Sequence, residues 1–169
     1  ETSQAPSIKQ SVDHVIDQFQ ALLAGEKGAQ GISTGYEELD RMSNGLKPGE
    51  MFVIAARPSM GKTSLMMNIV EHVCIEQSKP SLVFSCEMSS FQIVQRLVFS
   101  RAKFALSQLT RGYKATKADL TRIQRAATEV SAARMFIDDT PGITINEVRA
   151  KARRKKRDEG LEFIAIDYL

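Results

Sequence analysis

Residues 56–63 have the sequence Ala56-Arg57-Pro58-Ser59-Met60-Gly61-Lys62-Thr63, and this stretch decides the fold. The apolar run Met51–Ala55 before it predicts a short strand, and Thr63–Glu76 after it predicts a helix. A loop between a strand and a helix that ends in Gly-Lys-Thr is typical of phosphate-binding loops, because backbone N–H groups and the helix dipole attract anions there. The sequence therefore predicts a phosphate-binding loop.

Each residue type in the loop suits this chemistry. Gly61 lets the backbone approach a phosphate closely, the Lys62 ammonium supplies positive charge, and the Thr63 hydroxyl can ligate Mg²⁺. Ala56 stands where such loops usually have a first glycine, so an ordinary strand-to-helix turn is the alternative. The residues expected to contact the nucleotide are Arg57, Pro58, Ser59, Met60, Gly61, Lys62, Thr63, Ser64 and Asp167.

Two acidic residues follow other predicted strands. Glu87 lies just after Ser81–Ser85, and Asp167 ends Phe163–Asp167. Carboxyl ends of parallel strands meet at one edge of a sheet, so both should lie near the loop. Asp167 is the candidate second ligand of Mg²⁺, usually through water. Glu87 and Lys62 are the candidate catalytic residues, and Glu87 is expected to be the general base that orients a water. The alternatives are a turn-capping Asp167 and a Glu87 that only stabilises a helix start.

Strands alternate with helices along the rest of the chain, which predicts an α/β domain with a parallel sheet and right-handed crossovers. Capping boxes at Ser89/Gln92 and Thr144/Glu147 open two of the helices. The other expected features are a helix from Ser89 to about Phe104, a helix over Lys117–Ala133, a strand over Met135–Ile137, and a turn formed by Asp138 and Asp139.

The N-terminal part differs in pattern from the rest. Apolar residues recur at helical spacing over Ile8–Leu23, and Gly25–Gly31 has the composition of a linker. A short helix is expected over Tyr36–Met42, with Asn44-Gly45 as its left-handed stop. We therefore expect residues 1–31 to be a flexible lead-in, an amphipathic helix and a linker, and residues 32–169 to be the α/β domain.

Composition indicates where in the cell the protein is expected and whether its charge suggests nucleic-acid binding. The 169 residues have a net charge of only +3, and Cys74 and Cys86 have no metal-ligand spacing, so we expect reduced, buried thiols in a cytoplasmic protein. No signal pattern and no membrane-spanning run is present. One dense basic block, Arg149–Arg157, is either the solvated face of a helix or a nucleic-acid contact.

The residues together resemble one family. The segment from Ile32 to Thr63 (ISTGYEELDRMSNGLKPGEMFVIAARPSMGKT) is similar to the start of the motor domain in DnaB-type replicative helicases, in which alanine at the position of Ala56 is usual. FSCEMS around Glu87, IDDTPGITINEVRAKARR and FIAIDYL also resemble segments of that family, in the same order. The resemblance covers nearly the whole chain from Ile8 onward.

The resemblance implies a RecA-like P-loop NTPase with a mostly parallel sheet, in a homohexameric ring around single-stranded DNA that uses ATP and Mg²⁺. Helix Ile8–Leu23 would be the linker helix, which docks on the neighbouring subunit or folds back on its own domain. Arg96 would lie near the nucleotide or form a surface salt bridge. The chain would be a fragment ending after the second acidic motif, with a cut sheet edge. The arginine finger, sensors, DNA-binding loops and contacts to primase and a helicase loader would lie elsewhere.

Two other functions stay open. A recombinase or RadA-type repair ATPase shares the outline of ISTGYEELD and of the phosphate loop, although residues 56–60 and FSCEMS favour the helicase. The chain by itself could instead be a nucleotide-binding interaction module without turnover, because removing a trans-acting arginine lowers hydrolysis by roughly 10³–10⁵.

Overall fold

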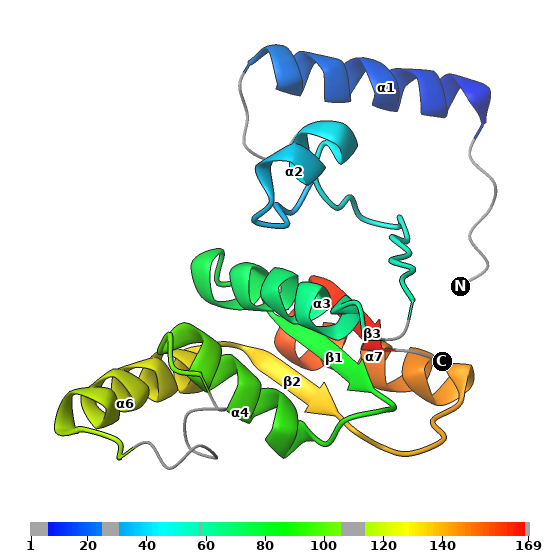
Figure 1. Ribbon diagram of the computed structural model, residues 1–169. Coiled ribbons are helices and arrows are strands. Elements are labelled where there is room, and N and C mark those ends of the chain that lie inside the picture. Colours follow the sequence, from blue (N-terminus) through cyan, green and yellow to red (C-terminus); the bar gives the residue numbers. More distant parts are fainter. Residues whose placement is uncertain (1–6, 25–30, 58, 106–113, 168–169) are drawn as a thin grey trace. The chain divides into compact units, whose positions relative to one another are not determined.

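The chain divides into two units, residues 1–53 and 54–169. The structure, a computed structural model, describes residues 7–24, 31–57, 59–105 and 114–167 (Figure 1). The linker expected at Gly25–Gly31 lies almost entirely outside the described residues. The domain boundary that the sequence places after residue 31 stays a prediction.

Three parallel strands form the sheet of the second unit, within the residues that the structure describes. They are β1 (Ser81–Ser85), β2 (Met135–Asp138) and β3 (Phe163–Asp167), in the order β2-β1-β3. Ser85 is paired with Asp167, and Phe84 is paired with Asp138. All three strands therefore end at the same edge of the sheet, and the predicted parallel α/β arrangement is confirmed.

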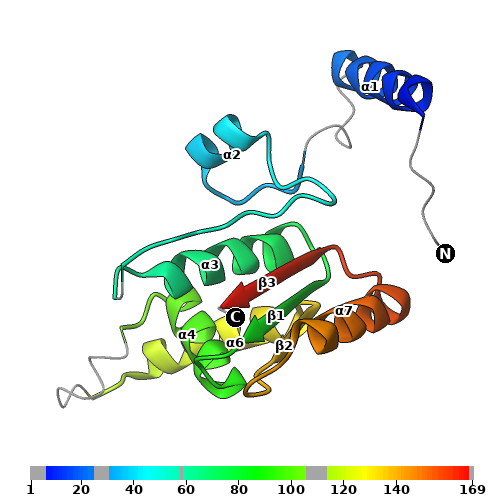
Figure 2. The same ribbon diagram turned by 90° about the vertical axis from the view of Figure 1, so that its right-hand side faces the viewer.

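Helices cover both faces of this sheet (Figure 2). On one face, Val83 of β1 and Ala165 of β3 pack against Val70 and Leu97, which come from two different helices. On the other face, Leu82 and Phe84 pack with Val148. Val83 and Phe84 are fully buried, and each such burial stabilises the fold by about 1.5–3 kcal/mol. Alternate residues of β1 thus serve two separate cores, as expected for a strand covered on both sides.

The helices of this unit follow the predicted order. They are α3 (Lys62–Glu71), which continues into a π-helical turn η2 (His72–Glu76), α4 (Ser90–Arg101), α6 (Lys117–Ala132) and α7 (Ile145–Glu159). Both predicted capping boxes are present, and a third one at Thr116/Asp119 opens α6. α4 ends three residues before the predicted Phe104. Lys103 adopts a left-handed conformation (φ 51°), which turns the chain so that Phe104 is buried against α6 residues such as Ala126.

The strand predicted at Met51–Ala55 is wrong. Within the described part of the chain, this segment has no regular secondary structure and pairs with none of the three strands. Met51 and Val53 are 85% and 73% exposed, so their apolar side chains lack the cover that the prediction assumed. A strand is defined by its hydrogen-bonded neighbour, and an apolar run alone supplies no such neighbour.

The first unit contains α1 (Ile8–Leu23) and α2 (Glu37–Ser43), both close to prediction. Asn44 has φ 59° and ends α2, as predicted for a left-handed stop. Within α2, the Asp40 carboxylate accepts hydrogen bonds from residues that precede the helix: the Thr34 amide (2.8 Å) and hydroxyl (2.7 Å) and the Ser33 hydroxyl (2.6 Å). These bonds outweigh burial, which alone would raise the pKa of Asp40, and hold that pKa below its ordinary value of 3.8.

The two cysteines lie in different environments. Cys74 is buried as predicted, and burial raises the pKa of its thiol. Cys86 is exposed, contrary to the prediction, because it lies just after β1, where the chain leaves the core. Among the described residues, no helix combines the length and the apolar character needed to cross a membrane.

Candidate nucleotide-binding site

The predicted phosphate-binding loop leads directly into α3. Gly61 is the N-cap of this helix, with φ 86° and ψ 20°, and no side chain caps the helix there. The left-handed φ favours glycine, although a Cβ at this position would meet no atom within 4 Å. Ser59 is also left-handed, with φ 63°, and the Met60 amide donates to the Arg57 carbonyl at 3.2 Å. The described part of the loop is thus a tight turn at the positive end of a helix dipole. Pro58, which was also expected to contact the nucleotide, lies outside the described residues.

Asp167 brings the two key loop residues together. Its Oδ1 lies 3.0 Å from the Lys62 ammonium, and its Oδ2 accepts a 2.5 Å hydrogen bond from the Thr63 hydroxyl. The Asp167 side chain is only 2% exposed, whereas that of Lys62 is 29% exposed. We call Lys62, Thr63 and Asp167 the Asp167 cluster. Because each carboxylate oxygen has a donor, the charge of a nearly buried side chain is balanced on both sides.

The fold explains why these distant residues meet. Asp167 is the last residue of β3, and α3 packs across β3 through the core that contains Val70 and Ala165. The first turn of α3 therefore lies beside the carboxyl end of β3. A parallel sheet with a helix after each strand gathers strand ends and helix starts at one edge, as the sequence predicted.

The loop that carries Glu87 begins next to this cluster. The Cys86 amide donates to the Asp167 carbonyl at 2.8 Å, which extends the β1–β3 pairing by one residue. The Ser85 hydroxyl donates to the Met88 carbonyl (2.8 Å) and accepts from the Met88 amide (3.1 Å). Glu87 itself is exposed, and its carboxylate forms no hydrogen bond or ion pair within the described ranges. The structure therefore places Glu87 in a hydrogen-bonded loop beside Asp167.

A cavity of about 310 Å³ opens between α3 and α4. Thr63 and Ser64 line one end of it, and Arg96 of α4 lines it from the other helix. Arg96 is exposed and forms no salt bridge to another described residue, so the surface salt bridge considered for it is not found. The position of Arg96 near the nucleotide stays a prediction, which is supported because Arg96 lines the same cavity as Thr63 and Ser64.

The cluster offers suitable ligands for a magnesium ion. A hydroxyl and a carboxylate are hard oxygen ligands, and Mg²⁺ commonly binds through one or two protein groups with phosphates and waters completing its shell. Thr63 and Asp167 supply such a pair, already adjacent through their 2.5 Å hydrogen bond. Within the described residues, no group of three or more histidine, cysteine or acidic side chains could hold a metal alone. The donor set therefore fits a metal shared with a phosphate.

The structure separates the two aspartates that were interpreted together as turn formers. Asp138 accepts from the Thr140 amide at 3.1 Å, as a turn former does, and pairs with Lys151 at 2.6 Å. Asp139 instead accepts from the Ser90 amide at 2.7 Å. Sequence reasoning missed this contact across 49 residues. The predicted topology could have indicated this contact, because the strand before Asp139 and the strand before Ser90 were expected to end at the same edge of the sheet.

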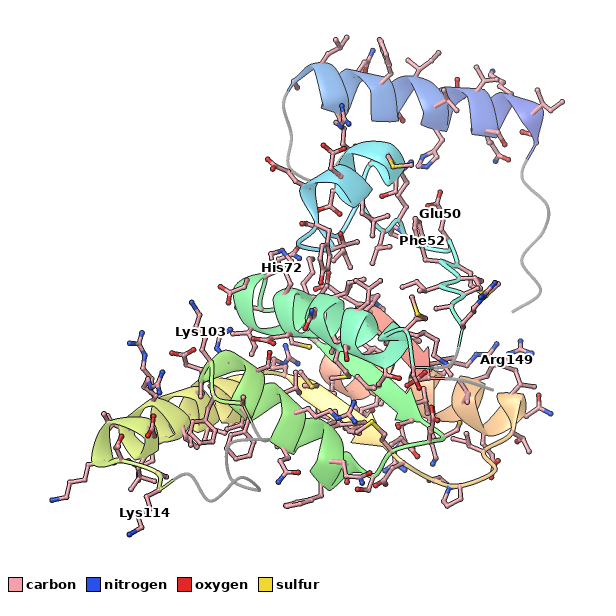
Figure 3. All side chains as sticks on the ribbon, in the orientation of Figure 1. Glu50, Phe52, His72, Lys103, Lys114 and Arg149 are labelled. Atoms are coloured by element: carbon pink, nitrogen blue, oxygen red, sulfur yellow. The ribbon has the colours of Figure 1, made fainter. Side chains whose placement is uncertain are left out.

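The basic block forms the outer part of α7. Four of its residues, Lys151, Arg154, Lys155 and Arg157, pair with carboxylates close by. Arg149, Arg153 and Lys156 are exposed, at spacing i, i+4 and i+7, and form no ion pair with any described residue; Arg149 is labelled in Figure 3. Part of the block is thus a solvated helix face, as one alternative held, and its contact with nucleic acid stays a prediction.

Comparison with known proteins matches this arrangement to one family. Residues 31–169 match the DnaB-like helicase C-terminal domain family. Among curated relatives, the replicative DNA helicase DnaB of Geobacillus stearothermophilus is 37% identical over 163 residues, which is 96% of this chain and 36% of that protein. The replicative DNA helicase DnaC of Bacillus subtilis strain 168 is 36% identical over 168 residues, covering 99% of this chain and 37% of that protein. The chain thus spans little more than a third of the length of these relatives.

Solved structures agree with the sequence relatives. One of them, an ATPase domain, superposes with a TM-score of 0.84 at 27% identity, covering 98% of this chain and 58% of that one. A DnaB-like replicative helicase, solved in work on its interactions with primase, has a TM-score of 0.81 at 27% identity, covering 98% of this chain and 39% of that one. The predicted RecA-like α/β fold is confirmed, and the chain belongs to the DnaB-like helicase C-terminal domain family.

Proposed function

We propose that this chain binds ATP with Mg²⁺ at the Asp167 cluster and forms the nucleotide-binding part of a replicative DNA helicase motor. The observation that carries the proposal is the convergence of the Lys62 ammonium and the Thr63 hydroxyl on the Asp167 carboxylate, at 3.0 and 2.5 Å. This cluster lies at the start of a helix whose N-cap is an uncapped, left-handed glycine. Membership in a helicase domain family supports the same function.

Each side chain has a separate task in this proposal. The Lys62 ammonium moves from Asp167 to the β- and γ-phosphates and neutralises part of their charge. Thr63 and Asp167 would hold Mg²⁺ through their hydroxyl and carboxylate oxygens. When bound, Mg²⁺ would stabilise the negative charge that develops on the transferred phosphoryl group. Loop amides near Met60 and Gly61 bind phosphate oxygens, because they lie at the positive end of the α3 dipole.

Glu87 is the proposed general base. Its exposed carboxylate forms no bond with another described residue, so it can accept a hydrogen bond from a water at the γ-phosphate. It orients that water and takes its proton as the oxygen attacks. The loop bond from the Cys86 amide to the Asp167 carbonyl supports this role, because it fixes the start of the Glu87 loop beside the metal ligand.

The test is a Glu87→Gln substitution in the intact protein. We expect Mg-ATP to bind with nearly unchanged Kd while kcat for hydrolysis falls by roughly 10²–10⁴, because glutamine is isosteric but cannot take a proton. Glu37→Gln is the matched control, since Glu37 is an exposed glutamate in α2. Hydrolysis at the normal rate by the Glu87→Gln variant would show that the base is another residue.

A motor also needs neighbouring subunits and DNA. Among the side chains of α1 that the structure describes, six apolar ones are at least 50% exposed: Ile8, Val12, Val15, Ile16, Phe19 and Leu23. This apolar stripe supports docking of α1 on a neighbouring subunit in a homohexamer that encircles single-stranded DNA. Primase and a helicase loader are proposed as further partners; the primase proposal draws on the related helicase that was studied for its interactions with primase.

The alternative functions give different outcomes. Family membership favours the helicase over a recombinase, and filaments in place of closed rings would contradict that choice. The chain alone could act as a nucleotide-binding module without turnover. In that case the purified chain binds Mg-ATP but hydrolyses it roughly 10³–10⁵ times more slowly than the intact protein, because no neighbouring subunit supplies an arginine in trans. Helicase-like turnover by the purified chain would exclude the second function.

A further inference from the structure

The side chain of Asp139 reaches from the end of β2 to the start of α4. Its Oδ2 accepts a hydrogen bond from the Ser90 amide at 2.7 Å. Ser90 is the first residue of α4, so its N–H has no partner within the helix. The Ser90 N–H bond also lowers the pKa of Asp139, which therefore stays ionised at neutral pH. A carboxylate at the start of a helix is stabilised further by the helix dipole.

This bond closes the loop that carries Glu87. At one end of the loop, the Cys86 amide donates to the Asp167 carbonyl at 2.8 Å. At the other end, the Ser90 amide donates to Asp139. Glu87 lies between these two attachments and has no bond of its own to a described residue. Together with the bonds between the Ser85 hydroxyl and the Met88 backbone, these attachments limit where its carboxylate can point.

The neighbouring Asp138 does not share this task. Its carboxylate pairs with Lys151 at 2.6 Å and accepts from Thr140, so it contacts α7 and its own turn. Burial opposes its ionisation, but the bonds from Lys151 and Thr140 together outweigh burial and lower the pKa of Asp138. Two adjacent aspartates of the same charge thus have different partners. This difference offers a matched pair for experiment.

We propose that Asp139 is a positioning residue for Glu87: it holds the start of α4 against the end of β2 and so aims the base at the γ-phosphate. This inference rests on the proposed function, in which Glu87 is the general base. Asp139 need not touch the nucleotide, because it acts through the backbone of the Glu87 loop. An error of about 1 Å in the position of a catalytic group can cost roughly 100-fold in rate.

The bond can be removed from either side. Asp139→Ala deletes the acceptor. Ser90→Pro deletes the donor, and proline is well tolerated as the first residue of a helix. Ser89 already has φ −68° and ψ 153°, which is the conformation required before a proline. The proline variant therefore tests the same bond if the alanine variant fails to fold, and Asp139→Asn keeps an acceptor oxygen and should rescue.

The measurement is ATP hydrolysis and Mg-ATP binding by the intact protein. We expect Asp139→Ala and Ser90→Pro each to lower kcat by roughly 10-fold or more, with Kd for Mg-ATP changed less than about threefold. Asp139→Asn should restore most of the rate. The control Asp138→Asn should keep kcat within about twofold. A normal kcat in both Asp139→Ala and Ser90→Pro, or an equal loss of binding and turnover, would overturn the proposal.

A double-substitution cycle separates this proposal from the one on which it rests. If Asp139 acts through Glu87, Asp139→Ala should have little further effect in a Glu87→Gln background. An undiminished effect there would overturn the positioning role. If Glu87→Gln alone keeps full hydrolysis, the base assignment fails. If Glu87→Gln loses hydrolysis while both single variants at the Asp139–Ser90 bond keep it, only the positioning role fails.

Discussion

Thr63 donates a 2.5 Å hydrogen bond to Asp167, a residue 104 positions later in the chain. One belongs to the first turn of a helix and the other to the end of a strand, and their contact joins a hydroxyl to a carboxylate at the positive end of a helix dipole. Lys62 binds the second oxygen of the same carboxylate. This arrangement underlies the nucleotide site and leads to the following predictions.

Lys62→Ala should weaken Mg-ATP binding by roughly 10- to 100-fold, as expected for loss of a charge-assisted bond worth about 1.5–3 kcal/mol. The nearly buried Asp167 carboxylate would also lose its cation and repel the phosphates. Titration calorimetry on the intact protein measures the effect. Lys79→Ala is the control, because Lys79 pairs with Glu162 and not with Asp167. Equal binding by wild type and the Lys62 variant would exclude the site.

Phe19→Asp should reduce assembly. Phe19 is 62% exposed in the apolar stripe of α1, and a carboxylate there would be buried without a partner in a subunit interface. Light scattering on the intact protein should record a shift from hexamers to smaller species at micromolar concentration. Asp17→Asn in the same helix is the control and should leave assembly unchanged. A stable hexamer in the Phe19 variant would argue against docking through this helix.

Asp40→Asn should destabilise the first unit in a pH-dependent way. The pKa of Asp40 in the folded chain lies below its ordinary value of 3.8, so its contribution is complete above that value and is lost as the pH falls through the lower, folded pKa. At pH 7 we expect a loss of about 1–3 kcal/mol, because the asparagine keeps one oxygen for Thr34 but turns an N–H toward the Ser33 hydroxyl and removes the negative charge from these bonds. Exchange of the Thr34 amide reports the change.

The outcome that would contradict this account of Asp40 is also clear. The difference between wild type and Asp40→Asn should shrink when the pH falls well below 3.8. An equal difference at pH 7 and at low pH would mean that the carboxylate charge contributes nothing. Asp13→Asn in α1 is the control and should have little effect at either pH.

The sequence predicted those features that local pattern determines. Phe163–Asp167 was predicted with its correct limits, because four apolar residues followed by an aspartate suffice to identify a strand and its end, although Ile164 and Ile166 are exposed. The capping boxes at Ser89 and Thr144 were confirmed, because a cap depends on residues three positions apart. The meeting of loop and strand followed from the rule that parallel strands end at one edge.

Features that depend on distant partners were not predictable in this way. Met51–Ala55 has the composition of a strand but no hydrogen-bonded neighbour in the described chain. In the sequence, Asp139 has the pattern of a turn aspartate, and its hydrogen bond to Ser90 depends on a segment 49 residues away. Cys86 was expected to be buried although it follows the predicted strand Ser81–Ser85; it is exposed because the chain leaves the core after that strand.

The central claim is that backbone amides around Met60 and Gly61, together with Lys62, bind the terminal phosphates of a nucleotide. The most direct test is a crystal structure of the intact protein with a non-hydrolysable ATP analogue and Mg²⁺. We predict phosphate oxygens on these amides, Lys62 turned from Asp167 toward the phosphates, and Mg²⁺ beside Thr63. Nucleotide bound elsewhere, or loop amides that face away from it, would contradict the account.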